Sequence, residues 1–306
     1  MSSKYDMIVI TGATAGGKTS VAVNLAYKLN AEIISADSRQ VYRGMDIGTG
    51  KDLDEYTING VKIPVHLIDI VDAGYKYNVF EYCNDFKKVY NDIKSRGKLP
   101  VLCGGTGLYI ESVLKNYQMI YVPVNMPLRK KLENLDLIEL EKILLNYKPL
   151  HNKSDLDTKK RAIRAIEIAD YYKKNNIPPT LENSINYIVF GILYDRDTRR
   201  KRISERLKYR LENGLIEEAI RLHQSGLSLE DMEYYGLEYK FLSYYLAGRI
   251  NKEELFFKLN TAIHQFAKRQ MTFFRKMEKD EIKIHWIDGN LTMKEKVEII
   301  LKTIKT

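Results

Sequence analysis

The segment GATAGGKTS, at residues 12–20, limits the possible folds of this chain more than any other feature. It has the spacing of a phosphate-binding loop, in which glycines let successive backbone N–H groups converge on phosphate oxygens. Lys18 adds a positive charge, and the Thr19 hydroxyl suits Mg²⁺. The predicted diphosphate cradle therefore consists of Gly12, Ala13, Thr14, Ala15, Gly16, Gly17, Lys18 and Thr19.

A chance match in a glycine-rich turn is the plainer interpretation of this segment, and the flanking sequence argues against it. The apolar run at residues 7–11 predicts a buried strand before the loop. Apolar residues at helical spacing predict a helix over residues 19–29 after it. A strand, a glycine loop and a helix N-terminus in this order form an anion site.

Further strand signals recur at residues 32–35, 66–70 and 99–103, and they alternate with segments of helical periodicity such as residues 80–93. This alternation predicts an α/β fold, a P-loop NTPase-like parallel sheet flanked by helices. Ligands of such sheets collect at the carboxyl ends of the strands. We therefore expect the glycine loop, Asp37 and the turn GGTG at residues 104–107 to share one crevice.

The domain organisation is suggested by a change of pattern near residue 122. From there to about residue 177 the chain is mostly helical and charged, and it is punctuated by Pro123, Pro127, Pro149, Pro178 and Pro179. We predict an inserted helical lobe over residues 122–182, between two parts of a core at residues 1–121 and 183–290. The apolar run at 185–193 predicts a strand that returns to the sheet, followed by helical sequence to residue 277 and a short last strand at 282–287.

The formal net charge of +9 favours a polyanionic partner, although acidic metabolites or solubility alone also explain it. Basic residues are concentrated at positions 194–210, where a solvated helix face is the plainer interpretation and a nucleic-acid footprint the other. The basic residues that accompany this run elsewhere are Lys159, Lys160, Arg161, Arg164, Lys268, Arg269, Arg275 and Lys276.

Compartment and cysteine chemistry are constrained by what the sequence lacks. No apolar run approaches the length of a membrane span, and the first predicted strand follows no apolar signal-peptide core. Cys83 and Cys103 cannot form a disulfide framework, and the five histidines show no metal-ligand spacing with them. We expect a cytoplasmic globular protein with no zinc site.

Two aspartates that follow predicted strands are candidates for chemistry. Asp37 lies where a carboxylate accepts a proton from a nucleophile that attacks a phosphate-bound group, and a cap or turn aspartate is the alternative. Asp69 closes the strand predicted at 66–70, and it either reaches a metal through water or caps the following turn.

The segment ADSRQVYRGMDIGTGK, at residues 36–51, closely resembles the tRNA dimethylallyltransferases, also called tRNA isopentenyltransferases. GATAGGKTS, HLIDIVD from residue 66, RGKLPVLCGGTGLY at 96–109 and AKRQMTFFR at 267–275 are similar to the same family, in family order. The resemblance spans nearly the whole chain. It implies transfer of a dimethylallyl group from dimethylallyl diphosphate to N6 of the adenosine 3′ of the anticodon in tRNA, with Mg²⁺ as cofactor, in a monomer with no membrane partner.

The resemblance also implies roles for individual residues. Asp37 matches the general base on the adenine amine, and Lys18, Thr19 and Thr106 match groups around the diphosphate, with Mg²⁺ held partly through Thr19. Arg202 and Arg206 match an arginine pair on a helix that faces the diphosphate. The residues expected to bind tRNA are Asp37, Ser38, Arg39, Gln40, Arg129, Lys160, Arg161, Arg164, Lys268, Arg269 and Gln270. Tyr42 is a candidate for stacking on the base.

The chain departs from the family pattern on its expected tRNA-facing side. The inserted lobe is shorter than usual, Val65-His66 stands for a His-His pair, and Glu238-Tyr239-Lys240-Phe241 stands for Gly-Tyr-Lys-Glu. His264 and Phe273 occupy positions where the family often has arginine and tryptophan. These departures spare the diphosphate site and bear on RNA recognition.

Three other functions remain open at this point. An adenylate isopentenyltransferase, acting on free AMP, ADP or ATP, would keep the fold and Asp37 but would need no extended basic helical region. A P-loop kinase of a small molecule would transfer the γ-phosphate of ATP and would leave the cluster at residues 37–42 unexplained. A nucleic-acid-binding protein without catalysis is disfavoured by the complete loop and the candidate base.

Overall fold

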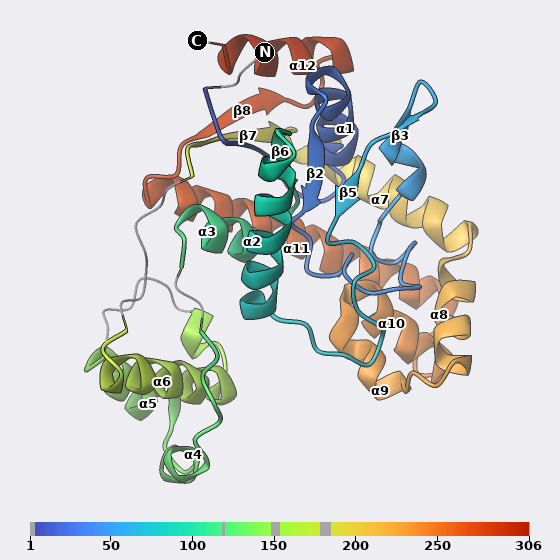
Figure 1. The fold of residues 1–306 in the computed structure, drawn as a ribbon. Coiled ribbons are helices and arrows are strands. Elements are labelled where there is room, and N and C mark those ends of the chain that lie inside the picture. Colours follow the sequence, from blue (N-terminus) through green and yellow to red (C-terminus); the bar gives the residue numbers. More distant parts are fainter. Residues whose placement is uncertain (1–3, 118–119, 148–153, 178–184, 306) are drawn as a thin grey trace. The chain divides into compact units, whose positions relative to one another are not determined.

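The computed structural model describes residues 4–117, 120–147, 154–177 and 185–305 (Figure 1). The chain divides into two compact units, one of Met1–Leu114 with Asn183–Thr306 and one of Lys115–Glu182. Pro149, Pro178 and Pro179, and the predicted boundary between residues 182 and 183, lie outside the described residues. The RNA-binding role of the inserted lobe stays a prediction.

The first unit is built on a parallel sheet of six strands in the order β5-β2-β6-β1-β7-β8 (Figure 1). Its central strands are apolar and buried, as expected for parallel strands covered on both faces. The strands are β1 Met7–Gly12, β2 Glu32–Ser35, β5 Val65–His66, β6 Pro100–Cys103, β7 Tyr187–Leu193 and β8 Ile284–Asp288. A separate hairpin pairs β3 Thr57–Ile58 with β4 Val61–Lys62. The predicted P-loop NTPase-like α/β fold is confirmed.

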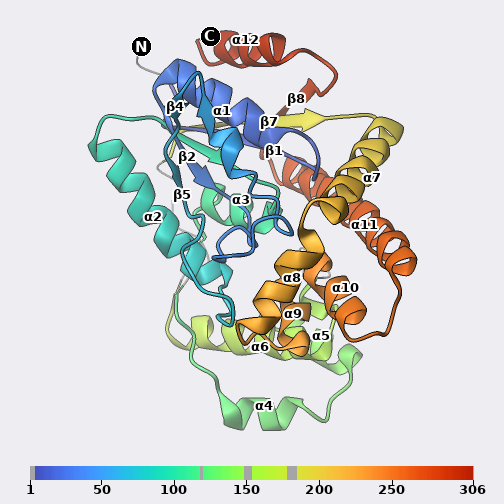
Figure 2. The same cartoon turned by 90° about the vertical axis from the view of Figure 1, so that its right-hand side faces the viewer.

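Successive side chains of the strands enter two different cores, because they point to opposite faces of the sheet. Ile8 and Ile10 of β1 pack with α1 Lys18–Leu29 and α12 Met293–Thr303, which lie together on one face (Figures 1 and 2). Met7 and Val9 belong to the larger core on the other face, with α2 Val79–Ser95, α3 Gly107–Leu114 and α11 Lys252–Lys279. The sheet is therefore held between two helical layers.

The larger core extends into a helical region, as predicted for the sequence up to residue 277. Its helices are α7 Arg196–Glu212, α8 Leu215–Gln224, α9 Leu229–Met232 and α10 Leu237–Leu246, followed by α11 (Figure 2). Helix α11 begins with a capping box between Asn251 and Glu254. No helix within the described ranges is long and apolar enough to cross a membrane.

The second unit is helical in its described part. It contains α4 Met126–Leu132, α5 Leu137–Leu145 and α6 Lys159–Lys174. The fully or nearly fully buried residues Leu140, Leu144 and Ile166 form a small core of their own between these helices. Helix α5 is started by a capping box between Asp136 and Glu139.

Two local predictions need correction. The strand predicted at 66–70 is wrong, because β5 ends at His66, and Leu67 and Asp69 have left-handed φ angles of 62° and 56° that a strand cannot contain. The helix α12 was not predicted, although the capping box of Thr292 and Glu295 marks its start. The hairpin of β3 and β4 was not predicted either, and the other predicted strands begin and end within two residues of the predicted positions.

Candidate active site

The phosphate-binding loop joins β1 to α1 with a backbone that requires glycine at its two ends. Gly12 has a φ of 142°, and a Cβ built there would lie 2.6 Å from the carbonyl oxygen of Ile192 in β7. Gly17 has a φ of 68° immediately before α1. These conformations bring the loop around to the N-terminus of α1, which favours an anion in the space above the sheet.

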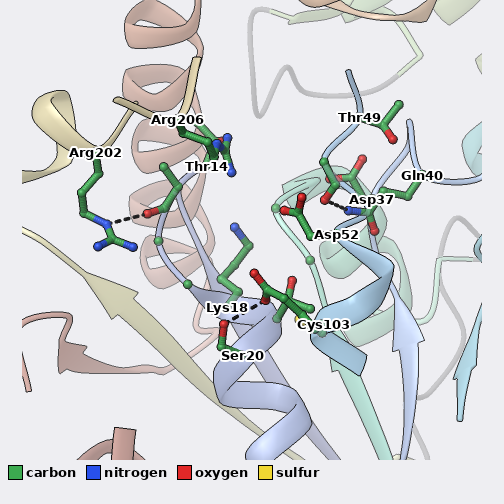
Figure 3. Close-up of a pocket in the computed structure, with 18 of the residues that line it drawn as sticks. Thr14, Lys18, Ser20, Asp37, Gln40, Thr49, Asp52, Cys103, Arg202 and Arg206 are labelled. Atoms are coloured by element: carbon green, nitrogen blue, oxygen red, sulfur yellow. Dashed lines mark hydrogen bonds between the residues drawn. The ribbon is translucent and has the colours of Figure 1, made fainter. Parts of the chain in front are cut away.

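A cavity of about 360 Å³ lies above this loop, at the carboxyl ends of the strands (Figure 3). One side, the phosphate wall, consists of residues 14–20 with Arg202 and Arg206. The opposite side, the loop wall, consists of Asp37, Gln40, Thr49, Gly50 and Asp52. Of the predicted site residues, the cavity therefore brings together residues 14–19, Asp37, Gln40, Arg202 and Arg206.

Lys18 is the first residue of α1, and its side chain rises from the phosphate wall into the cavity (Figure 3). Its Nζ donates to the carbonyl oxygen of Ala13 at 2.9 Å, which fixes the ammonium above the loop. Burial and the Arg206 guanidinium lower the pKa of Lys18, while Asp37 opposes this shift. A bound diphosphate would supply the counter-charge that this buried cation lacks.

Arg202 and Arg206 extend from α7, one helical turn apart, and both donate hydrogen bonds to the phosphate-binding loop. Arg202 donates from Nε to the carbonyl oxygen of Ala15 at 2.9 Å, and Arg206 donates to the hydroxyl of Thr14. Burial, with the neighbouring Arg210, lowers the pKa of Arg206 to about 10, so this guanidinium remains charged at neutral pH. The phosphate wall therefore presents three cations to a ligand.

Gln270 of α11 supports the loop from behind. Its Oε1 accepts from the backbone N–H of Thr14 at 2.9 Å, and its Nε2 donates to the carbonyl oxygen of Gly105 at 2.9 Å. Only 9% of this residue is exposed, so both ends of the amide are committed to the protein. The neighbouring Lys268 and Arg269 are exposed, and their contact with tRNA stays a prediction.

The loop wall begins directly after β2 with Asp37, whose Oδ1 accepts from the backbone N–H of Arg39 at 2.9 Å. The Thr106 hydroxyl accepts from the N–H of Ser38 at 3.0 Å, so Thr106 ties the turn after β6 to this segment. Gln40 is 9% exposed, donates from Nε2 to the carbonyl oxygen of Gly50 and accepts from Ser35. Asp37 is thus held with its carboxylate at the cavity.

Two interpretations of single residues are wrong. Tyr42 is fully buried, its hydroxyl accepts from the N–H of Tyr77 at 3.1 Å, and its ring packs edge-on against Tyr235 at 4.8 Å, so no face is left for a base. Among the described contacts Asp69 caps no turn and does not line the cavity, because its carboxylate pairs with the fully buried Lys51. Both residues support the loop wall from below.

The basic residues predicted in the inserted lobe hold that unit together. Arg129 donates to both carboxylate oxygens of Glu167, at 3.0 and 2.9 Å, and Arg164 pairs with the same carboxylate. Burial opposes the ionisation of Glu167, but these partners outweigh it and lower its pKa to about 2. Arg161 pairs with Asp157, and Lys160 is exposed. Contact of these four residues with tRNA stays a prediction.

Three residues that depart from the family pattern, Glu238, His264 and Phe273, lie close to other residues of the described structure. Burial raises the pKa of Glu238, against the opposing effect of Arg210 and Arg206. His264 lies 3.3 Å from the Ser204 hydroxyl, and burial lowers its pKa. Phe273 packs so closely on Gly107 that a Cβ there would lie 2.3 Å from its ring.

Residues that could hold a metal are found on the phosphate wall. Among the described residues, no group of three or more His, Cys, Asp or Glu side chains is arranged to hold a metal ion. Mg²⁺ needs no such group, because it keeps several waters and is commonly held by one or two protein oxygens together with substrate phosphates. The Thr19 hydroxyl, which lines the cavity beside the loop, fits that mode of binding.

The sequence analysis missed one group that organises this site. Glu218 of α8 is 2% exposed, and it accepts hydrogen bonds from three consecutive backbone N–H groups of the loop that forms the loop wall. A signal was present in the sequence. Glu218 falls at the apolar positions of its helix, together with Leu215, Ala219 and Leu222, where a carboxylate needs buried donors.

Comparison with protein families identifies this arrangement. A family model described as IPP transferase matches residues 40–277, and one described as isopentenyl transferase matches residues 5–63. The chain belongs to the IPP transferase family. The two matches together include both walls of the cavity, so the site of this IPP transferase lies within the part of the chain that defines the family.

Two bacterial relatives of this IPP transferase match it over nearly their whole length. A protein of Bacteroides fragilis named tRNA dimethylallyltransferase 2 is 56% identical over 98% of both chains. The crystal structure of a tRNA isopentenylpyrophosphate transferase from Bacillus halodurans is similar with a TM-score of 0.71 and 31% identity, over 99% of this chain and 96% of that one. A eukaryotic dimethylallyltransferase described as acting on tRNA has the same fold, with a TM-score of 0.74 and 23% identity over 92% of this chain and 73% of that one.

Proposed function

We propose that this protein transfers a dimethylallyl group from dimethylallyl diphosphate to N6 of the adenosine 3′ of the anticodon in tRNA. The observation that carries this proposal is the pairing of a phosphate-binding loop and the Asp37 carboxylate in one cavity. The names of relatives that share most of this sequence support the same reaction and the same RNA. A small-molecule kinase would also use the loop but would leave the cluster at residues 37–42 unexplained.

The phosphate wall suits a diphosphate that acts as a leaving group. As the bond between C1 of the dimethylallyl group and the diphosphate oxygen breaks, its electron pair moves to that oxygen and positive charge develops on the allyl group. Backbone N–H groups, Lys18, Arg202 and Arg206 stabilise the charge that appears on the diphosphate. Because these donors are already held in place, little reorganisation is needed during the reaction.

The loop wall suits the acceptor. The lone pair of the adenine amine forms the new bond to C1, and the amine then carries a proton that must be removed. Asp37 accepts this proton, which makes positioning and late proton transfer its contributions. To reach the cavity, the base has to be turned out of the anticodon loop, which costs a few kcal/mol of unstacking.

Mg²⁺ would be held by the Thr19 hydroxyl together with diphosphate oxygens, and it would neutralise charge on the leaving group. Arg39, Arg129, Lys160, Arg161, Arg164, Lys268 and Arg269 are the side chains proposed to contact tRNA phosphates or bases. The exposure of Lys160, Lys268 and Arg269 supports this assignment. We also propose that the protein works as a monomer in the cytoplasm.

The direct test is incubation with Mg²⁺, radiolabelled dimethylallyl diphosphate and either unmodified tRNA that has adenosine next to the anticodon or free AMP. We expect label in tRNA, and a fall in rate of about 10²- to 10⁴-fold for Asp37→Asn, because a positioned general base contributes that much. The exposed Asp54→Asn is the matched control, since it removes the same charge outside the cavity.

Each outcome separates the alternatives left open by the sequence. Label in AMP alone would assign the protein to the adenylate isopentenyltransferases. Label in neither acceptor would contradict the proposed function. Transfer of the γ-phosphate of ATP to a small molecule, measured with labelled ATP, would identify a kinase.

A further inference from the structure

A buried carboxylate on the helical side of the first unit accepts four hydrogen bonds. Oε2 of Glu218 accepts from the backbone N–H groups of Asp46 at 2.9 Å and Ile47 at 2.8 Å. Oε1 accepts from the N–H of Gly48 at 2.9 Å and from the hydroxyl of Tyr239 at 2.6 Å. Three successive N–H groups that converge on one anion form a nest, and every acceptor position of the carboxylate is used.

The contact between this nest and α10 is tight. A Cβ built at Gly48 would lie 2.6 Å from the ring of Tyr239, so the backbone of the nest rests directly on that ring. Burial and the Glu218 carboxylate raise the pKa of Tyr239, so its hydroxyl stays protonated and donates. The position of the nest is therefore fixed from two helices, α8 and α10.

The nest continues without a break into the cavity. Thr49, Gly50 and Asp52, which follow it in the chain, all line the loop wall. The carbonyl oxygen of Gly50 accepts from Nε2 of Gln40 at 2.9 Å, and Gln40 lines the same wall three residues after Asp37. A displacement of the nest is thus passed through Gly50 and Gln40 to the segment that carries Asp37.

The phosphate wall has separate supports. Gln270 holds Thr14 and Gly105, and Arg202 holds Ala15, and none of these contacts involves α8, α10 or the nest. The hydrogen bonds that hold Thr14, Ala15 and Gly105 are therefore separate from those of the nest, and the two walls are joined through α7, in which Arg210 pairs with Asp52 of the loop wall. We expect a change at Glu218 to act more strongly on the loop wall, which it contacts directly, than on the phosphate wall.

We propose that Glu218, with Tyr239, is a positioning residue for the acceptor base, because it holds the nest at Asp46–Gly48 and thereby sets where Gln40 and Asp37 meet adenine. This inference rests on the proposed function, in which adenine occupies the loop wall. Glu218 itself touches neither substrate. Its effect is to place the groups that do.

The test is Glu218→Gln, which keeps the size of the side chain but replaces one acceptor oxygen with an NH₂ donor that faces the Gly48 N–H or the Asp46 and Ile47 N–H groups. The RNA probe is an unmodified anticodon stem-loop with adenosine 3′ of the anticodon, and the second probe is dimethylallyl diphosphate alone. We expect kcat/KM for the stem-loop to fall about 10- to 100-fold, since a 1 Å misplacement of a reacting group costs about 10²-fold. We expect the Kd of dimethylallyl diphosphate, measured by calorimetry, to stay within about twofold.

Two further variants keep the proposal falsifiable. Glu111→Gln is the matched control, because Glu111 is also 2% exposed and ion-paired, with Lys276, but lies in α3 away from the nest. It should leave the ratio of the two measurements unchanged. Tyr239→Phe removes one of the four donors and should reduce kcat/KM for RNA in the same direction, by less than Glu218→Gln.

The outcomes are distinct. A selective loss in the RNA measurement supports the positioning role. An equal loss in both measurements would mean that Glu218 only stabilises the fold, and no loss in either would mean that the nest does not position the base; each of these overturns the inference. If the wild-type protein modifies no RNA, the proposed function itself fails, and the variants are not needed to see it.

Discussion

The two walls of the cavity differ in where their order comes from. The backbone of the phosphate wall is a run of consecutive residues whose conformation is set by its own glycines and by the start of α1, and Arg202 and Arg206 of α7 are added to it. The loop wall takes its shape from contacts with distant parts of the chain, such as Glu218, about 170 residues from the nest that it binds. The phosphate wall thus rests mainly on a local motif, while the opposite loop wall is shaped by long-range contacts.

The difference teaches which kind of substitution is informative on each side. On the phosphate wall, the groups proposed to bind the diphosphate are backbone amides and cations, so we expect removal of a single charge to act directly on the leaving group. On the loop wall, a change behind the cavity acts through geometry. The two walls should therefore separate in experiments that measure binding of donor and use of acceptor independently.

Among the variants that test this comparison, Lys18→Met is expected to lower the rate of transfer the most. Loss of a preorganised donor to the developing diphosphate charge should lower kcat by about 10²- to 10³-fold at saturating RNA. The affinity for the RNA stem-loop, measured by filter binding, should change little. Lys28→Met, at the exposed end of the same helix, is the control and should behave as wild type. A normal kcat for Lys18→Met would show that the phosphate wall does not hold the leaving group.

A smaller effect is expected for Gln270→Leu, which tests whether the phosphate wall depends on its own support. The variant leaves the N–H of Thr14 and the carbonyl oxygen of Gly105 without their buried partners. With each of the two hydrogen bonds worth about 1 kcal/mol, the Kd of dimethylallyl diphosphate should rise by up to about 30-fold. Gln265→Leu, exposed on the same helix, serves as the control. A selective loss in RNA use instead would break the separation of the two walls.

The smallest effect on transfer is expected at Glu32, at the start of β2 and away from both walls. A hydrogen bond from Arg96, assisted by His66, lowers the pKa of Glu32 from 4.5 to about 2. The carboxylate therefore stabilises the folded state above pH 4.5, and this contribution is lost as the pH falls from 4.5 toward 2.

Urea unfolding of wild type and Glu32→Gln at several pH values tests this expectation. The difference in free energy of unfolding should be about 1–3 kcal/mol near pH 7 and should shrink below pH 4.5. The rate of transfer at pH 7 should stay within about twofold of wild type. Asp92→Asn, which removes the exposed partner of Arg96, should have little effect on either measurement. A difference that grows in acid would contradict the assigned pKa direction.

The sequence allowed prediction of features that are encoded over short stretches. The phosphate-binding loop, the strands at its sides and the helical region up to residue 277 follow from periodicity and from glycine placement, and they are present. The family followed from the motifs, and the match over residues 40–277 confirms it. These are the parts of the molecule in which neighbours in sequence are neighbours in space.

The predictions that failed concern residues whose environment is made elsewhere. Tyr42 looked available for stacking, but Tyr77 and Tyr235 bury it. The sequence suggested a metal-binding or capping role for Asp69, but its carboxylate forms an ion pair with Lys51, 18 positions away in the sequence. The role of Glu218 depends on the approach of α8 to the loop wall, which no local pattern encodes. Long-range partners decide such residues, and a single sequence does not reveal them.

The strand order sets a fixed length in the reaction. In the proposed reaction the loop after β1 binds the donor and the segment after β2 binds the acceptor, and both strands are neighbours of β6. Their separation is therefore two interstrand spacings, about 9–10 Å, a value set by backbone hydrogen bonds. Even the turn after β6 leaves no room for adjustment, because a Cβ at Gly104 would lie 2.2 Å from the carbonyl oxygen of Ala36. The sheet therefore sets the spacing between the segments that form the two walls, and we expect side-chain changes in either wall to alter how firmly each substrate is bound rather than that spacing.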